Sequence, residues 1–407
     1  MATPTHIWPR RTWPLAALTE AQWARWESDG YLIIPDAVPL SLARAASAAV
    51  RAYVGAEDGN KSSWYANTLD IYEDLDTDGL KPHHGPCGMA QMFHHSSLWA
   101  LRQHPHLHSI FADLYGTRRL YVTADRAHFK PPQSDAYPAW SDPGPVHVGL
   151  HWDVDTRPSN WPVPYVMQGV VYLEDTAADQ GALRVVPGFH TRLAAWSATQ
   201  PANRSAERPT GAAAETLAAE AAPLEGKAGS LVVWHSLLPH GPAPNVGSAP
   251  RVSAYVTMLP VDAAPFLGPR RLADAPLGMS DAGTLAYLPD MPLPEGYIEE
   301  AHGEAEAHGG AEGKGSPVAE EAQCEEASPP SAGLPAPAAP GFKRQSRERR
   351  AERWRHRLPL LDEDPTEAQL SRRPPGEEDG EPAHLTPLGQ RLVGLVEWEA
   401  DPEANLG

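Results

Sequence analysis

The chain has 407 residues, a formal net charge of −19 at pH 7 and a hydrophobic fraction of 42%. This length suits one large domain or two ordinary ones, and the composition is sufficient for a packed core. The negative charge argues against a nucleic-acid-binding protein, because such a protein needs a cationic surface to displace counterions from phosphates. We therefore expect a small-molecule substrate as partner and no nucleic acid.

The number of cysteines and the hydropathy of the sequence indicate the cellular compartment in which we expect the protein. Cys87 and Cys324 are the only cysteines in the sequence, which indicates neither a disulfide framework nor a cysteine metal site. No stretch has the apolar run of a signal peptide or the roughly 20 residues of a membrane span. We expect a soluble, cytoplasmic protein without a membrane span, and the sequence does not indicate its oligomeric state.

The N-terminal part predicts a helix, a strand and a second helix. Residues 18–30 begin with Thr19 and Gln22 at the spacing of a capping box and end on Gly30, so they predict a short helix. The run YLIIPD follows as a strand. The alanine-rich segment 39–54 has apolar residues at helical spacing and predicts the second helix.

Between about residues 118 and 260 the pattern changes to short β-type runs separated by Pro and Gly. These runs are RLYVTADRAHF, PVHVGLHWDV, YVMQGVVYLED, ALRVVPG, GSLVVWH and RVSAYVTML. Many short strands between turns predict a barrel or two-sheet sandwich. The segment 198–226 is too long for a hairpin turn and predicts an inserted loop with a helical piece. We therefore expect a mainly β domain with flanking helices over residues 1–297.

The C-terminal third has a different composition. Residues 298–342 are rich in Glu, Ala, Gly and Pro with almost no large apolar side chain, which predicts a disordered insertion. Residues 343–407 begin with a basic helix candidate, FKRQSRERRAERWRHR, which we interpret as a solvated helix, with a nuclear-localisation or anionic-partner patch as the alternative. The final block LTPLGQRLVGLVEW is apolar enough to dock on the core.

The stretch HVGLHWDVDTRP, residues 147–158, concentrates histidines and aspartates. Residues two apart on a strand face the same side, so His151 and Asp153 would point inward together while Trp152 points away. His147 and Asp155 share this parity one step further along. An imidazole and a carboxylate at this spacing can occupy neighbouring positions on a metal ion without bending the backbone.

A third ligand is available in SLVVWHSLLPHGPAPN, which contains His235 and His240. We favour His240, which directly precedes Gly241 at the end of a predicted strand. His235 lies in the middle of the run and suits packing or support of a ligand. Two histidines and one carboxylate leave three positions of an octahedron open, as in non-haem Fe(II) oxygenases. Structural zinc would require a closed set of four ligands.

The run RVSAYVTML predicts a strand with Arg251, Ser253, Tyr255 and Thr257 on one face. A guanidinium matches the two oxygens of a carboxylate, and the Ser253 hydroxyl adds a donor. We expect His240 and Arg251 on neighbouring antiparallel strands joined by the loop GPAPNVGSAP. Arg251 would then hold one end of a small dicarboxylate, with the length and chemistry of 2-oxoglutarate, whose other end reaches the iron.

Five segments in order are similar to the phytanoyl-CoA dioxygenase family of Fe(II)/2-oxoglutarate oxygenases. They are LTEAQWARWESDGYLIIPDAV (18–38), HWD (151–153), DQGALRVVPGFH (179–190), LLPHGPAPN (237–245) and PRVSAYV (250–256). The resemblance spans about residues 18–260, and the final block is similar to the C-terminal end of a microbial and algal branch. It implies a catalytic domain with a double-stranded β-helix core, a cupin-like jelly roll, with supporting helices.

By this resemblance His151, Asp153 and His240 are the catalytic iron ligands, and Arg251, helped by Ser253, binds the 5-carboxylate of 2-oxoglutarate. The implied reaction is hydroxylation of a small organic or lipid-like substrate with Fe(II), 2-oxoglutarate and O2, releasing succinate and CO2, with ascorbate as the reductant in vitro. Halogenases of this class leave the position of Asp153 to a halide, so a carboxylate there favours hydroxylation.

The chain departs from the family at two places. PGFH stands where members commonly have Pro-Gly-Ser-His, so we interpret His190 as a turn residue or a residue that supports a ligand. Trp152 stands where many members have Gln. The histidine-rich segments 83–95 and 104–108 do not have the spacing of a second metal site and suit a cover over the pocket mouth, and Lys130 is a candidate pocket cation.

Two other functions remain open. One is a jelly-roll protein that binds a metal and 2-oxoglutarate without turnover, and the other is a zinc-type hydrolase that uses the same triad. The sequence does not indicate the substrate or whether an acyl-CoA is involved.

Overall fold

The computed structural model describes residues 6, 8–65, 88–90, 92–137, 149–261, 383–393, 395 and 398. The predicted disordered insertion 298–342, the basic helix candidate, His147 and both cysteines lie outside these residues. In the part of the chain that is described, every helix is too short or too polar to cross a bilayer.

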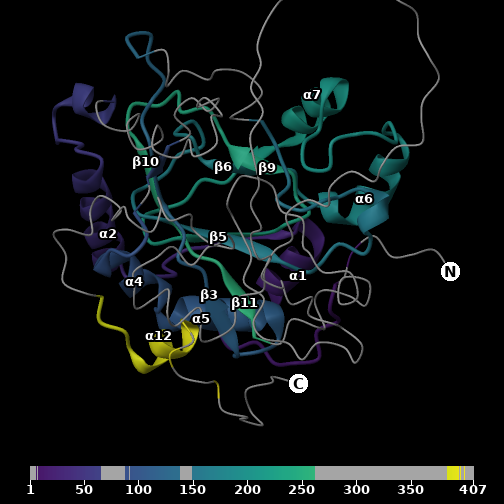
Figure 1. Ribbon diagram of the computed structural model, residues 1–407, viewed down its shortest axis with the longest axis horizontal. Helices are drawn as coiled ribbons and strands as arrows, with labels where there is room; N and C mark the ends of the chain where they lie inside the picture. The colour runs from purple at the N-terminus through teal and green to yellow at the C-terminus, as the bar shows by residue number, and fades with distance from the viewer. Residues whose placement is uncertain are drawn as a thin grey trace, which may run out of the picture.

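Helices flank a set of short strands (Figure 1). The helices are α1 (Glu20–Asp29), α2 (Leu40–Tyr53), η1 (Lys61–Tyr65), α4 (Ser96–Arg102), α5 (Pro105–Tyr115), η3 (Pro158–Asn160), α6 (Phe189–Ala198), α7 (Gly211–Glu220) and α12 (Pro387–Leu392). The strands are β1 (Tyr31–Ile34), β2 (Met89–Ala90), β3 (Leu120–Val122), β4 (Ala127–Lys130), β5 (Met167–Tyr172), β6 (Leu183–Val185), β7 (Ala222–Pro223), β8 (Leu231–His235), β9 (His240–Pro242), β10 (Arg251–Tyr255) and β11 (Met258–Pro260).

The core consists of two sheets between which the chain alternates. The major sheet has the order β1-β8-β5-β10-β4-β2, and the minor sheet has the order β7-β6-β9. A bridge between His151 and His240 adds the segment around His151 to the edge of β9. Along the chain, β4, β5, β8 and β10 of the major sheet are each separated by segments of the minor sheet. This alternation is the double-stranded β-helix, or jelly roll, and the fold class predicted from the sequence is confirmed.

Side chains of the major sheet alternate between two buried layers. In β5, Met167 and Val171 pack with the helices α2, α4 and α5, while Val170 and Tyr172 point between the two sheets. The same parity places Val233 on the helix side and Trp234 in the interior. The period of two that defines a strand therefore separates a helix-covered core from an enclosed barrel interior.

The N-terminal elements form as predicted. Thr19 accepts a hydrogen bond from the Gln22 backbone while the Gln22 side chain accepts one from the Thr19 backbone, and Gly30 ends α1 in the left-handed conformation (φ 75°). Strand β1 then joins the edge of the major sheet beside β8. The predicted second helix is α2.

Two predicted strands differ in the structure. The described part of the run at 145–154 is irregular and contributes only the bridge at His151, because the backbone of Trp152 donates to Glu207 in the inserted loop (2.7 Å). The run RVSAYVTML is interrupted at Val256 and Thr257, after which β11 pairs with β3 in a separate two-stranded sheet. The inserted loop itself contains the helix α7, as predicted.

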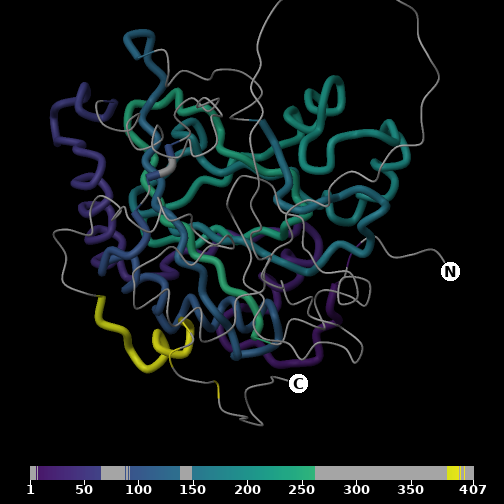
Figure 2. The backbone as a smooth tube through the Cα atoms, in the orientation of Figure 1, coloured from purple at the N-terminus to yellow at the C-terminus, as the bar shows by residue number. Residues whose placement is uncertain are grey.

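The C-terminal segment lies against α5 and β3, far along the chain from its neighbours (Figure 2). The Gln103 side chain donates to His384 O (2.9 Å) and accepts from Thr386 N (2.8 Å). Trp398 donates to Leu120 O (3.0 Å), and its ring stacks on His108 at an interplanar angle of 11°. Specific hydrogen bonds thus fix this segment to the helix side of the core.

The N-terminal segment is fixed at two places. Asp113 of α5 is fully buried and accepts hydrogen bonds from the backbone of Ala16, Ala17 and Leu18 (2.7–3.0 Å). Further towards the N-terminus, Trp8 stacks on His235, with ring centroids 5.1 Å apart. These contacts hold the chain before α1 against the outer face of the barrel.

Replacing Asp113 with alanine should strongly destabilise the protein, because the backbone N–H groups of Ala16, Ala17 and the buried Leu18 lose their acceptor at once. We expect the free energy of unfolding to fall by about 3 kcal/mol in urea denaturation. The partly exposed Asp29, which pairs with Arg25 across one helical turn, is the control, and its replacement with alanine should cost less than about 1 kcal/mol. Equal effects of the two substitutions would contradict this role of Asp113.

His235 should make the stability depend on pH. Burial lowers its pKa well below 6.5, with further lowering by His190 and His6. As the pH falls below about 6.5 the unfolded chain takes up a proton that folded His235 does not, so the free energy of unfolding falls. Replacing His235 with Phe should remove about 1.4 kcal/mol per pH unit from this slope between pH 6 and 5. Urea unfolding of metal-free protein measures it, and parallel pH profiles would contradict the prediction.

Candidate metal centre

Three of the predicted residues meet in the interior of the barrel. His151, Asp153 and His240 each offer one ligand atom, and these atoms lie within 4.8 Å of one another. His240 Nε2 is 3.0 Å from Asp153 Oδ2, and His151 Nε2 is 3.5 Å from Asp153 Oδ1. No other group of His, Cys, Asp and Glu among the described residues has this compactness.

Backbone pairing brings the two histidines together. His151 N donates to His240 O (2.9 Å) and His240 N donates to His151 O (3.0 Å). A Cβ atom at Gly241 would lie 2.9 Å from Gly149 O, so the close approach of the two segments requires glycine there. His240 stands at the first position of β9, which corrects the prediction that it ends a strand: the turn before it, not after it, delivers the imidazole.

Backbone carbonyls orient both imidazoles. His240 Nδ1 is 2.9 Å from Leu238 O, and His151 Nδ1 is 3.5 Å from Gly149 O. Because a carbonyl only accepts, the hydrogen of each neutral ring lies on Nδ1, and both Nε2 atoms are left as ligand atoms. This is the common way in which proteins fix the tautomer of a metal-binding histidine.

The protonation states suit metal binding. Burial lowers the pKa of His151 to about 4, and the charges of His240 and Arg208 act in the same direction against that of Asp153. Burial alone would raise the pKa of Asp153, but the neighbouring His240 and His151, together with Gln168, lower it to about 2. A neutral His151 and an ionised Asp153 are the forms that bind a cation.

The predicted carboxylate-binding residues lie on the interior face of the major sheet. Arg251 is 1% exposed; it donates to Gly181 O (3.0 Å) and Ser253 Oγ (3.3 Å), while its Nε has no protein acceptor. Lys130 stands directly opposite on β4, is also buried, and donates to Ala243 O (3.1 Å). The Arg251 Nε atom is therefore a buried donor that suits an anion, and Lys130 adds a second buried positive charge on the same face.

The relation between His240 and Arg251 differs from the prediction. They do not lie on neighbouring antiparallel strands: β9 pairs with β6 in the minor sheet, and β10 pairs with β4 and β5 in the major sheet. The connecting loop crosses between the sheets, fixed by Asn245, whose side chain donates to Lys130 O and Ala249 O (2.9 Å each). The iron candidates and the guanidinium thus come from opposite walls of one interior.

Other candidate residues lie outside the centre. His235 shares the helix-side parity of β8 and contacts Trp8, and His190 pairs with Glu27 O (3.0 Å). Trp152 points away from its neighbours, as predicted, and packs against Phe189 and Trp196.

The described members of the histidine-rich segments have structural contacts. His95 caps α4, and His108 pairs with Arg118 O. His94 is in hydrogen-bond distance of the Trp99 indole (3.3 Å). His83 and His84 lie outside the described residues.

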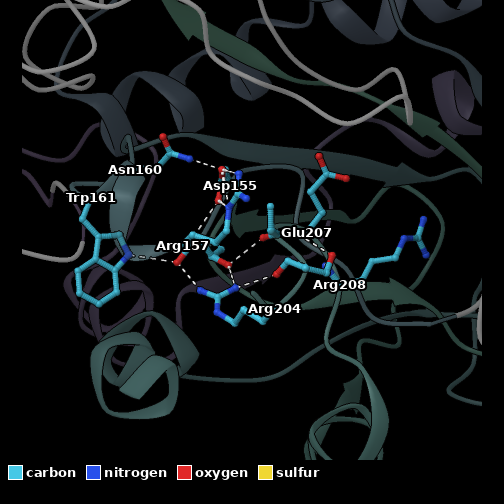
Figure 3. A network of polar contacts seen from close by, with 10 residues as sticks. Asp155, Arg157, Asn160, Trp161, Arg204, Glu207 and Arg208 are labelled. Atoms are coloured by element: carbon cyan, nitrogen blue, oxygen red, sulfur yellow. Dashed lines mark hydrogen bonds and ion pairs between the residues drawn. The ribbon is translucent and has the colours of Figure 1, made fainter. Parts of the chain in front are cut away.

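Asp155 does not join the centre, because other partners hold it. Arg157 and Asn160 bind its carboxylate, and Arg204 from the inserted loop donates to Thr156 O (2.6 Å; Figure 3). The inserted loop thereby lies alongside the segment that carries His151 and Asp153. Sequence reasoning did not foresee this contact, since both segments lack regular periodicity.

Sequence reasoning also missed Gln168 of β5, which is buried and contributes to the low pKa of Asp153. The only clue in the sequence is a polar residue at an inward-facing position of an otherwise apolar strand. This clue becomes informative only once the strands that pair with β5 are known. The donor set as a whole fits a divalent ion of the iron type: two imidazoles and one carboxylate, with no fourth protein ligand in the group.

Comparisons with known proteins agree with this geometry. A curated Dictyostelium discoideum protein that carries the phytanoyl-CoA dioxygenase name is 24% identical over 190 residues, covering 39% of this chain and 52% of that protein. The chain therefore spans about half the length of this curated relative.

Two solved structures are partly similar to the chain. The non-haem α-ketoglutarate-dependent epimerase SnoN from nogalamycin biosynthesis has 16% identity and a TM-score of 0.40, over 60% of this chain and 83% of that chain. EctD from S. alaskensis has 19% identity and a TM-score of 0.41, over 65% and 83%.

The family model for phytanoyl-CoA dioxygenase matches residues 26–253, which is more than half of the 407 residues. The match begins within α1 and ends within β10, and it includes His151, Asp153, His240 and Arg251. The chain therefore belongs to the phytanoyl-CoA dioxygenase family.

Proposed function

We propose that the protein is an Fe(II)- and 2-oxoglutarate-dependent dioxygenase that hydroxylates a small organic or lipid-like molecule and releases succinate and CO2. The observation that carries this proposal is the compact group His151, Asp153 and His240. It shares one buried interior with Arg251, and family membership supports the same chemistry.

Each residue has a separate role in this proposal. His151, Asp153 and His240 hold the ion through Nε2, a carboxylate oxygen and Nε2. Bound Fe(II) supplies the activation of O2 and the oxidative decarboxylation of 2-oxoglutarate, with ascorbate as reductant in vitro. Arg251, with Ser253 and Lys130, binds the 5-carboxylate, since Arg251 Nε is a buried donor without a protein acceptor and a guanidinium matches the two oxygens of a carboxylate.

The carboxylate at Asp153 supports hydroxylation rather than halogen transfer, because it occupies the coordination position that a halide would need. A protein that binds metal and 2-oxoglutarate without turnover, and a zinc-type hydrolase, are the alternatives, and neither would form succinate.

Loss of the Asp153 carboxylate should abolish turnover. With Fe(II), ascorbate and 2-oxoglutarate, we expect the wild-type protein to consume O2 and release succinate slowly even without substrate. Replacing Asp153 with alanine should lower succinate release at least about 100-fold, because the ion loses its charged ligand. An Asp153→Ala protein with full succinate release would remove Asp153 from the centre, and a wild type without any release would overturn the proposed reaction.

Replacing Arg251 with alanine should weaken 2-oxoglutarate binding. We expect the KM for 2-oxoglutarate in succinate release to rise about 10- to 100-fold, as for a lost hydrogen-bonded charge pair. The rate with 2-oxobutyrate, which lacks the distal carboxylate, should change little. Arg192→Ala, which removes an exposed ion pair with Glu220, is the control. An equal loss with both oxo acids would show that Arg251 does not bind the distal carboxylate.

A further inference from the structure

Two of the three candidate ligands lie on a segment without regular structure, residues 151–157, which we call the ligand segment. His151 forms a bridge with His240, but residues 152–157 form neither a helix nor a strand around Asp153. In a strand, paired backbone hydrogen bonds would fix the direction of each side chain. Because Asp153 Oδ2 lies 3.0 Å from His240 Nε2, other contacts must hold the backbone that carries this carboxylate.

The inserted loop, residues 198–226, lies alongside the ligand segment and accepts hydrogen bonds from it. Trp152 N, between the two ligand residues, donates to Glu207 O (2.7 Å). Thr156 donates to Ala206 O through its backbone N–H (3.2 Å) and through its hydroxyl (2.9 Å). Asp153 therefore lies in a stretch of chain that is bonded to the inserted loop on both sides.

Arg204 of the inserted loop holds the Thr156 end of this stretch. Its guanidinium donates to Thr156 O (2.6 Å) and to Thr156 Oγ1 (2.9 Å; Figure 3). The same group donates to Ser197 Oγ of α6 (3.3 Å), and its Cζ lies 5.0 Å from the centre of the Trp196 ring, also on α6. Because a guanidinium is planar and has several donors in a fixed geometry, Arg204 joins the ligand segment firmly to α6.

The bonds from Arg204 exceed what the burial of Thr156 requires. Thr156 is fully buried, but its carbonyl also accepts a hydrogen bond from Trp161 Nε1 (3.1 Å), and its hydroxyl donates to Ala206 O. Both oxygens would keep a partner without Arg204, so the need to satisfy buried polar groups does not explain the arginine. What Arg204 adds is a fixed position of Thr156 relative to α6.

The two carboxylates of the ligand segment have different partners. Asp155 is bound by Arg157 (2.6 Å) and Asn160, which hold it outside the centre. Asp153 lies beside both imidazoles of the centre. A shift of the backbone between Asp153 and Thr156 would change the distance of the Asp153 carboxylate from both imidazoles.

We propose that Arg204 is a positioning residue of the metal centre, which holds Thr156 in place and thereby fixes the backbone that directs the Asp153 carboxylate. This inference rests on the proposed metal-binding role of His151, Asp153 and His240. Groups that orient a ligand from outside typically change metal affinity about 10- to 100-fold when they are removed. Since Arg204 acts through the intervening backbone, we expect the lower end of this range.

The test is the binding of Co(II), a visible-absorbing substitute for Fe(II), to the metal-free full-length protein. Arg204→Met keeps an aliphatic stem and loses the guanidinium, and Arg204→Lys keeps the charge without the planar set of donors. Both should weaken Co(II) binding about 10-fold and change the Co(II) absorption spectrum, which depends on the geometry of the ligands. Thr156→Val, which removes the hydroxyl that Arg204 binds, should have a smaller effect in the same direction.

Arg192→Met is the matched control. Arg192 Cζ lies 5.4 Å from the centre of the Phe189 ring of α6, and its guanidinium pairs with Glu220 of α7. Arg192 therefore also joins α6 to the inserted loop, but it does so through α7 and not through the ligand segment. The Co(II) affinity and spectrum of Arg192→Met should equal those of the wild type.

The melting temperature of each metal-free protein separates positioning from folding. A lower melting temperature with unchanged Co(II) affinity and spectrum in the Arg204 variants would overturn the proposal, and so would an equal loss of affinity in Arg192→Met. If Arg204→Met does not fold, Arg204→Lys and Thr156→Val decide by the same criteria. A wild type that binds Co(II) but forms no succinate with Fe(II) would overturn the proposed reaction, while Co(II) binding would still decide the role of Arg204.

Discussion

The burial of charged groups between the two sheets is the constraint on which the site depends. Asp153, Lys130 and Arg251 are all nearly inaccessible to water, where an unpaired charge is strongly unfavourable. The acidic group lies beside two imidazoles, while Arg251 and Lys130 stand at opposed positions of the major sheet and donate to backbone carbonyls. A cation beside Asp153, and an anion beside the Arg251 Nε atom that has no protein acceptor, would therefore suit these two regions of the interior.

Side chains alternate between the two faces of each strand, and this alternation determines both which residues form the core and which residues point towards the site. On β8 it turns Trp234 inward and His235 outward, although the two are adjacent in the sequence. On β5 it places Gln168 on the interior side, with Val170 and Tyr172. Backbone groups then complete the centre, since Leu238 O and Gly149 O orient the imidazoles. The strand and turn residues that orient the site therefore also belong to the packing of the two sheets.

Local patterns predicted the local features of this protein. The capping box of α1, the short strands of the core and the shared direction of His151 and Asp153 depend on residues close in sequence, and the sequence indicated each of them. The fold class could also be predicted, because a chain with many short strands between turns has few arrangements in which each strand buries one face.

Features that depend on pairing between distant segments could not be predicted in this way. The strand expected around His151 is irregular because the inserted loop takes one of its hydrogen bonds. The expected pairing of the strands of His240 and Arg251 was wrong because the loop between them changes sheets. The roles of Lys130 and Gln168 can be inferred only when the residues opposite them on the neighbouring strands are known. The sequence of one strand does not give these neighbours, because the register is set by the whole sheet.

The glycine at position 241 has a consequence for the spacing of the two imidazoles. A Cβ atom there would lie 2.9 Å from Gly149 O, so even one methyl group would force the two segments apart. These segments carry His151 and His240, whose backbones pair with each other. The absence of a side chain at position 241 therefore keeps the two histidines as neighbours.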